Sequence, residues 1–143
     1  MFNPTRDQAR TFFTECWRKR RANESMEAME QLVADIIASH PEYHALFENP
    51  DAADKDFAPE DGQINPFLHI SLHLAVEEQL GIDQPPGLRA AYEECLNRRG
   101  NAHEARHDIL ESLAETLWEA QRNGTPMDAL AYVERVKRRA GSD

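Results

Sequence analysis

The sequence has few cysteines, no long apolar run and a shortage of positive charge. Its two cysteines, Cys16 and Cys95, are far apart and form no CxxC pair, so we expect reduced, partly buried thiols rather than a disulfide or a thiolate site. No apolar run approaches the roughly 18 residues that span a membrane, and the start, MFNPTRDQAR, lacks the apolar region of a signal peptide. These absences predict a cytoplasmic protein with no membrane association.

The shortage of positive charge argues against a nucleic-acid partner. The chain has 16 Lys and Arg residues against 26 Asp and Glu, a formal net charge of −10 at pH 7, whereas affinity for a phosphate backbone comes mostly from Lys and Arg. Two short basic runs, residues 18–21 and 137–139, each lie where we expect a helix to end, and the helix dipole favours positive side chains there. A protein partner or a homo-oligomer remains open.

The residues that are present indicate an all-α fold in one domain, residues 1–143. A chain of 143 residues with 41% hydrophobic residues can bury a core without disulfides or other crosslinks. Asn-Pro pairs at positions 3–4 and 65–66 are typical helix starts, and apolar residues recur at helical spacing with no stretch typical of a strand. We expect a compact bundle of about five or six helices. They span approximately residues 4–22, 25–40, 66–81, 86–99, 101–124 and 125–140.

Two segments lie outside this helical pattern. Residues 48–64 are acidic and punctuated by Pro50, Pro59 and Gly62, and a loop of this length in a compact domain tends to be either a functional lid or disordered. We expect a solvated acidic loop, with a cover over a neighbouring site as the alternative. Residues 140–143 are predicted to form a frayed tail.

The pattern H-x3-H-x3-E occurs in the expected helix 66–81, as His69, His73 and Glu77. Residues four apart lie on one face of a helix, with Cβ atoms about 5–6 Å apart, so both imidazoles can converge on one point. At about 100° per residue the two histidines fall within an apolar stripe that includes Val76 and Leu80, and the glutamate falls at its edge. Histidines on a core-facing stripe need polar partners, and a metal ion is one such partner.

The same pattern occurs a second time, as His103, His107 and Glu111 in the expected helix 101–124. The same construction places both histidines on a stripe with apolar residues that include Leu117 and Trp118, so we expect this stripe to face the core. Two helices with identical spacing predict a metal site between them.

A third H-x3-H pair, His40 and His44, is interrupted by Pro41. Proline at this position predicts a helix boundary between the two histidines, which favours a surface or capping role. A short helix over residues 41–47 would restore part of the geometry, and a share in the metal site is the alternative.

Residues 103–107, HEARH, also satisfy the H-E-x-x-H pattern of zinc proteases, in which Glu104 would be the general base. Arg106 and Asp108 stand where that family usually has uncharged side chains, so proteolysis is a minor alternative. The Glu-x-x-His pattern of di-iron bundles is matched once, by Glu104 and His107, and not on the other histidine helix. Ligands rich in histidine suit zinc, iron, nickel or copper better than magnesium or calcium.

Several strings of the sequence together resemble a bacterial family catalogued as domain of unknown function 1841. They are MFNPTRDQAR, HPEYH, PEDGQINPFLHISLHLAVEEQ, IDQPPG and the HEARH helix, and they cover nearly the whole chain. The resemblance implies no activity, because the family has no assigned reaction.

The leading hypothesis is an uncharacterised cytoplasmic helical protein that binds a transition metal ion, namely zinc, iron or nickel. Its ligands would be His69, His73, His103 and His107, with Glu77 and Glu111 as further ligands or as partners of the histidines. The alternative is a non-enzymatic protein-interaction module whose buried histidines form a metal-free hydrogen-bonded network. Whether the protein is an enzyme is left open.

Overall fold

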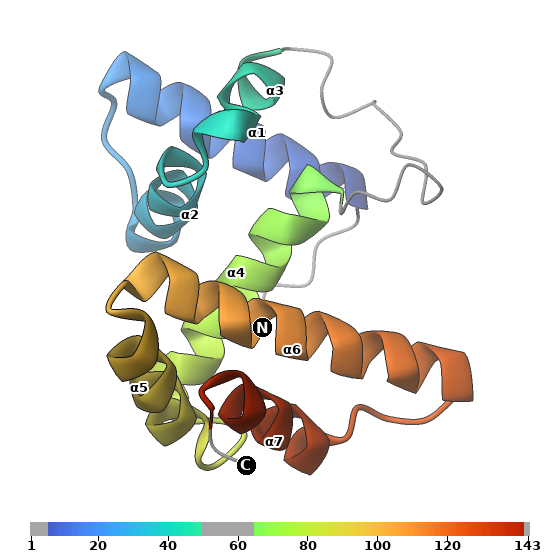
Figure 1. Cartoon of the computed structure of the whole chain (residues 1–143). Helices are drawn as coiled ribbons and strands as arrows, with labels where there is room; N and C mark the ends of the chain where they lie inside the picture. Colours follow the sequence, from blue (N-terminus) through green and yellow to red (C-terminus); the bar gives the residue numbers. More distant parts are fainter. Residues whose placement is uncertain (1–5, 50–64, 142–143) are drawn as a thin grey trace. The chain divides into compact units, whose positions relative to one another are not determined.

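The computed structural model describes residues 6–49 and 65–141, which fold into seven α-helices and one short 3-10 helix without any strand (Figure 1). The expected all-α fold is therefore confirmed for this part of the chain. Most of the expected acidic loop, the last two residues of the expected tail and the Asn3-Pro4 helix start lie outside the described residues. No helix in the described ranges combines the length and apolarity needed to cross a membrane.

The contacts divide the chain into two compact units, one up to Leu74 and the other from Ala75 onward. The boundary falls within a single continuous helix, α4 (Pro66–Ile82). The expectation of one domain over residues 1–143 stays a prediction, and each unit is described by itself.

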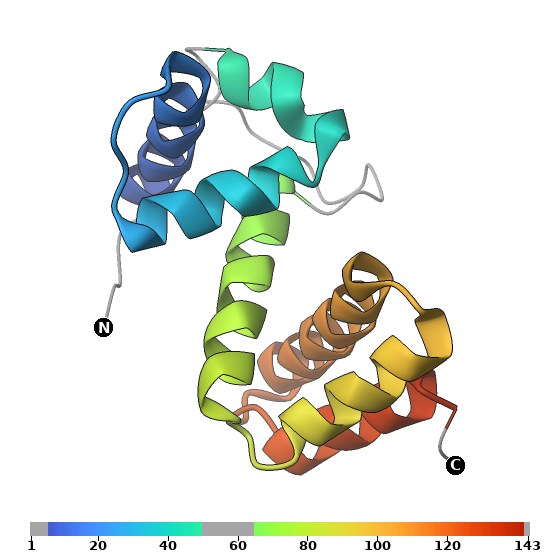
Figure 2. The ribbon, with the colours of Figure 1, turned by 90° about the vertical axis from the view of Figure 1, so that its left-hand side faces the viewer.

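The first unit contains α1 (Arg6–Ala22), α2 (Ala28–Ala38), the 3-10 helix η1 (Pro41–Tyr43), α3 (His44–Glu48) and the first half of α4. Figure 2 shows α1 and α2 joined by a short link, as expected for neighbouring helices. Helix α2 begins at Ala28, later than the expected start at residue 25, and Glu30 accepts a hydrogen bond from the backbone N–H of Glu27 at 2.9 Å. The apolar faces of these helices form one core. Its members are Phe13, Cys16, Trp17, Val33, Ile36, Ile37, Phe47, Phe67 and Ile70.

The second unit packs α5 (Leu88–Arg99), α6 (Ala102–Asn123) and α7 (Ala129–Arg139) with the second half of α4. Gly100 and Gly124, both with positive φ, end α5 and α6 as the sequence predicted. The expected start of the last helix at Thr125 and Pro126 is wrong, because Asp128 caps α7 by accepting a hydrogen bond from the backbone N–H of Ala131.

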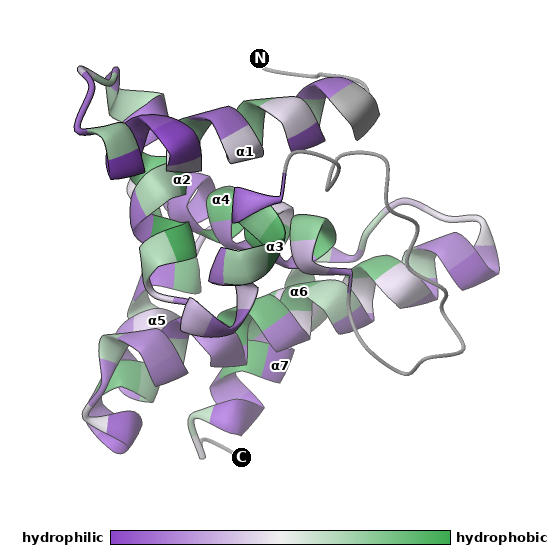
Figure 3. Ribbon diagram, turned by 90° about the horizontal axis from the view of Figure 1, so that it is seen from above, coloured by the Kyte–Doolittle hydropathy of each residue, from purple (hydrophilic) through white to green (hydrophobic). Residues whose placement is uncertain are grey.

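Two polar contacts hold the second unit together. The Tyr132 hydroxyl donates to Oε1 of Gln79 at 2.6 Å, which ties α7 to α4. Buried Asp108 on α6 accepts two hydrogen bonds from Arg99 at the end of α5, at 2.8 and 3.0 Å. The helices carry hydrophobic and hydrophilic residues side by side (Figure 3), and the buried members of this unit include the apolar residues Leu88, Ala91, Cys95, Ile109, Leu113, Val133 and Val136.

Candidate metal centre

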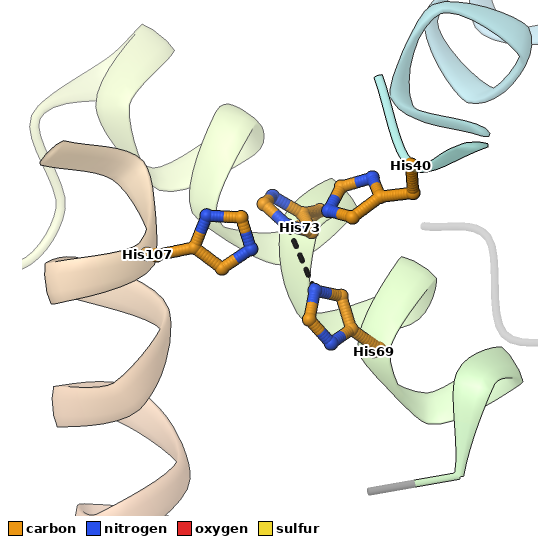
Figure 4. A group of neighbouring side chains, drawn as sticks. All are labelled: His40, His69, His73 and His107. Carbon is orange, nitrogen blue, oxygen red and sulfur yellow. Dashed lines mark hydrogen bonds between the residues drawn. The ribbon is translucent and has the colours of Figure 1, made fainter. Parts of the chain in front are cut away.

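Three histidines of the first unit converge on one point. His69 and His73 lie one turn apart on α4, and His40 directly precedes η1. The ring centroids are 4.9 Å apart for His40 and His69, 4.6 Å for His40 and His73, and 4.9 Å for His69 and His73. Figure 4 draws these three rings together with His107 of α6, which belongs to the second unit. We refer to His40, His69 and His73 as the histidine cluster.

The position of His40 follows from the end of α2. The helix stops at Ala38, and the Pro41 ring starts η1, so His40 occupies the bend between the two elements, with φ −125° and ψ 71°. Its Nδ1 lies 2.7 Å from the carbonyl oxygen of Ile36. A carbonyl oxygen can only accept, so Nδ1 carries the proton and the neutral ring has its lone pair on Nε2. In this tautomer Nε2 is the nitrogen that a metal ion would bind.

The two α4 histidines show a related arrangement. The Nε2 atoms of His69 and His73 are 3.1 Å apart, and His69 Nδ1 lies 3.3 Å from the Tyr43 hydroxyl. Two ligands of a tetrahedral zinc ion with Zn–N bonds of about 2.0–2.1 Å would be separated by about 3.3 Å. The observed spacing therefore suits two nitrogens that share a metal ion, with the tyrosine hydroxyl as the outer partner of His69.

Burial of the histidine cluster makes its polar contacts energetically important. His40 and His73 are 1% and 4% exposed, and His69 is half-buried. One ring nitrogen from each of the three lies within 4.8 Å of those of the others. Burial, followed by the charge of Glu42, raises the pKa of the neighbouring Tyr43 hydroxyl, which therefore stays protonated at neutral pH. Imidazole nitrogens at this spacing can form a donor set for a transition metal.

The other half of the HPEYH string has a different role. His44 Nε2 donates a hydrogen bond to the carbonyl oxygen of Ile37 at 2.9 Å, and the ring packs on Trp17 with centroids 4.5 Å apart. The two histidines of the third H-x3-H pair therefore have different roles. His44 caps a carbonyl oxygen of α2, and His40 belongs to the histidine cluster. From the sequence, a share in the metal site was only the alternative role for His40. The H-x3-H spacing of this third pair was the feature that pointed to it.

The second histidine pair lies at the start of α6, in the second unit. The rings of His103 and His107 are 4.4 Å apart between centroids, and His107 Nδ1 lies 2.9 Å from the carbonyl oxygen of His103. His107 is half-buried, whereas His103 is exposed.

The predicted core-facing stripe of α6 is partly wrong. Leu117 and Trp118 are 36% and 57% exposed. Most buried residues of α6, such as Ala105, Ile109 and Thr116, lie instead on the side of the helix away from His103. Leu110, on the same side as the histidines, is also buried, so that part of the predicted stripe is correct. The sequence offered apolar residues on both sides of α6, and contacts with α5 and α7 decided between them.

Each glutamate that the sequence proposed for the site has an arginine partner. Glu77 forms an ion pair with Arg106, Glu111 lies 3.6 Å from Arg139, and Glu104 lies 3.9 Å from Arg99. Each of the three glutamates therefore lies beside an arginine of the second unit.

The described residues thus define a class, an all-α protein with a histidine cluster that can hold a metal ion. The family model described as Domain of unknown function (DUF1841) matches residues 5–138, and the chain belongs to this family. Comparisons with curated proteins and with solved structures find no match. The resemblance read from the sequence is confirmed, and any function must be argued from the residues themselves.

Proposed function

We propose that this protein binds one transition metal ion through Nε2 of His40, His69 and His73. The observation that carries the proposal is the convergence of three largely buried imidazoles, two of them with Nε2 atoms 3.1 Å apart. The outer nitrogens of His40 and His69 face the Ile36 carbonyl and the Tyr43 hydroxyl. Metal-binding histidines almost always have such outer partners, which fix the ring and its tautomer.

We propose His107 as the fourth ligand. Its Nδ1 donates to a backbone carbonyl, so in the neutral ring Nε2 is the nitrogen that a metal ion would bind. The support for this choice is the duplicated H-x3-H spacing of α4 and α6, in which His107 has the same place as His73. His103, the other ligand that the sequence predicted on α6, serves as the comparison.

An all-imidazole donor set narrows the metals to those that accept nitrogen ligands, and we propose zinc, nickel or iron in a cytoplasmic protein. Four histidine ligands would close a tetrahedral site, as in structural zinc sites, whereas three would leave a position for water and allow hydrolytic chemistry. The number of ligands therefore decides between a structural and a catalytic centre.

A second candidate is the protein-interaction module with a metal-free histidine network. It is favoured by one observation, namely that no buried side-chain nitrogen or oxygen in residues 6–49 and 65–141 lacks a hydrogen-bond partner. A network satisfied in this way does not require a metal for stability.

Competition titration with a chromophoric chelator separates these candidates. Zinc and nickel are titrated into metal-stripped wild type and into His73→Ala, His107→Ala and His103→Ala. We expect one site in the wild type, its loss in His73→Ala, and clear weakening in His107→Ala but not in His103→Ala. Wild-type protein that does not compete with the chelator favours the metal-free network, and equal affinity of His107→Ala and wild type restricts the site to three histidines.

A further inference from the structure

A cavity of about 390 Å³, broadly open to solvent, lies in the second unit and shares no residue with the histidine cluster. Its walls come from the second half of α4, from α5 and from the start of α6. The volume falls in the range of small-molecule sites, roughly 300–1,000 Å³. Leu80, Leu96 and the ring of Tyr92 supply apolar surface, and four charged residues line the rest.

Arg106 is fixed in the wall of this cavity. Its Nε donates to Glu77, its Nη1 donates to the Tyr92 hydroxyl at 3.1 Å, and its guanidinium carbon lies 5.3 Å from the centre of the Tyr92 ring. Within residues 6–49 and 65–141 its Nη2 has no hydrogen-bond partner. The side chain is therefore held in place while one amino group remains for a ligand.

Arg89 of α5, which also lines the cavity, is anchored by hydrogen bonds as well. Its Nε and Nη2 donate to the carbonyl oxygens of Leu80 and Gly81 at the end of α4, at 3.1–3.2 Å. Its Nη1 has no partner among the described residues. Two guanidinium groups, each anchored by two nitrogens, thus line one cavity with a donor left on each.

The two glutamates that line the cavity differ in their partners. Glu77 is neutralised by Arg106, whereas Glu93 is exposed on α5 and has no ion pair in the described part of the chain. The lining therefore offers guanidinium donors and apolar surface, with Glu93 as its one carboxylate that has no ion pair in the described residues. A ligand suited to this wall has one carboxylate and an apolar body, because arginine donors match carboxylate oxygens.

We infer that this cavity binds a small carboxylic acid with an apolar body, held by Arg89 and Arg106. The inference goes beyond the metal site and does not depend on it. Benzoate is a suitable probe, because it combines a carboxylate with a ring of a size that fits beside Leu80, Leu96 and Tyr92.

The test is isothermal titration of metal-stripped protein with benzoate, with the uncharged benzamide as the matched ligand control. We expect saturable benzoate binding in wild type, binding weaker by about tenfold or more in Arg89→Gln, and no comparable binding of benzamide. Arg138→Gln removes the same charge from an exposed position of α7 outside the cavity and should bind as wild type does. Circular dichroism establishes that each variant is folded.

Two further variants make the outcome decisive. Glu93→Gln should tighten benzoate binding, because it removes the unpaired negative charge. Benzylamine binding to wild type that weakens in Glu93→Gln, without benzoate binding, would overturn the inference and assign the cavity to amines. His73→Ala should bind benzoate unchanged, which separates this site from the metal centre. The inference is overturned if wild type shows no saturable binding, or if Arg89→Gln and Arg138→Gln bind benzoate equally.

Discussion

The clearest prediction concerns His40 and His44, which the sequence presents as one motif and the structure separates. His40 is 1% exposed and lies in the histidine cluster, whereas His44 is half-buried against Trp17. Replacing either histidine with alanine should lower the free energy of unfolding. Only His40→Ala should also abolish stabilisation by metal.

The expected magnitudes follow from the contacts. His44→Ala loses a 2.9 Å hydrogen bond to Ile37 and a ring contact with Trp17, worth together about 1.5–2.5 kcal/mol. At roughly 2–4 °C per kcal/mol for a chain of this size, its melting temperature should fall by about 3–10 °C. Metal at about 100 times its Kd stabilises the folded protein by about 2.7 kcal/mol, which raises the melting temperature of wild type by about 5–11 °C.

Differential scanning calorimetry of metal-stripped protein, with and without zinc, tests this prediction. Without zinc, the melting temperatures of both variants should be lower than that of wild type. Zinc should raise the melting temperature of His44→Ala by the full amount and that of His40→Ala hardly at all. The reasoning is refuted if zinc stabilises His40→Ala as much as wild type, or if His44→Ala loses the rise while still folded by circular dichroism.

Three further predictions address contacts around and outside the site. Tyr43→Phe removes the hydroxyl 3.3 Å from His69 Nδ1, so zinc affinity in a chelator competition should fall by about 10–100-fold; unchanged affinity would exclude this outer role. Asp108→Ala leaves Arg99 without its two hydrogen bonds to a buried carboxylate, so urea denaturation should show a loss of about 2–3 kcal/mol, moderated by the exposure of the arginine. Burial raises the pKa of Cys16 from its ordinary value near 9 to about 12, so the folded state keeps a proton that the unfolded state releases. This contribution to stability is present below pH 9 and falls away toward pH 12, and Cys16→Ala should lack that part of the pH dependence in urea titrations.

Local signals in the sequence predicted the helices well, because they depend on residues close together in the chain. Asn101 caps α6 by accepting from the Glu104 backbone N–H at 3.1 Å, and Gly124 ends the helix in the left-handed conformation. Competing signals caused the boundary error at α7, where Pro126 marks a helix start but Asp128 provides the side-chain cap.

The site was only partly predictable for a physical reason. Helical spacing alone brings His69 and His73 together, since both lie on α4. The membership of His40 depends on the bend that Pro41 sets after α2 and on how α2 packs near α4, which no local pattern determines. The ion pair between Glu77 of α4 and Arg106 of α6 could not be predicted from local sequence patterns either, so Glu77 was interpreted as a possible ligand.

The orientation of α6 shows a different limit. Apolar residues occur on both sides of this helix, and periodicity favoured the side with the histidines and Trp118. The three-helix packing of the second unit buries Ile109 and Leu113 instead and leaves Trp118 57% exposed. A hydrophobic pattern with two apolar faces does not predict which one a neighbouring helix will cover.

The most direct test of the central claim is elemental analysis of protein purified without an affinity tag, comparing wild type with the His40→Ala/His73→Ala double variant. The account predicts about one equivalent of a single metal, zinc, nickel or iron, in wild type and none in the variant. Metal-free wild type that also fails to take up these ions after reconstitution, or equal metal content in the two proteins, would contradict it.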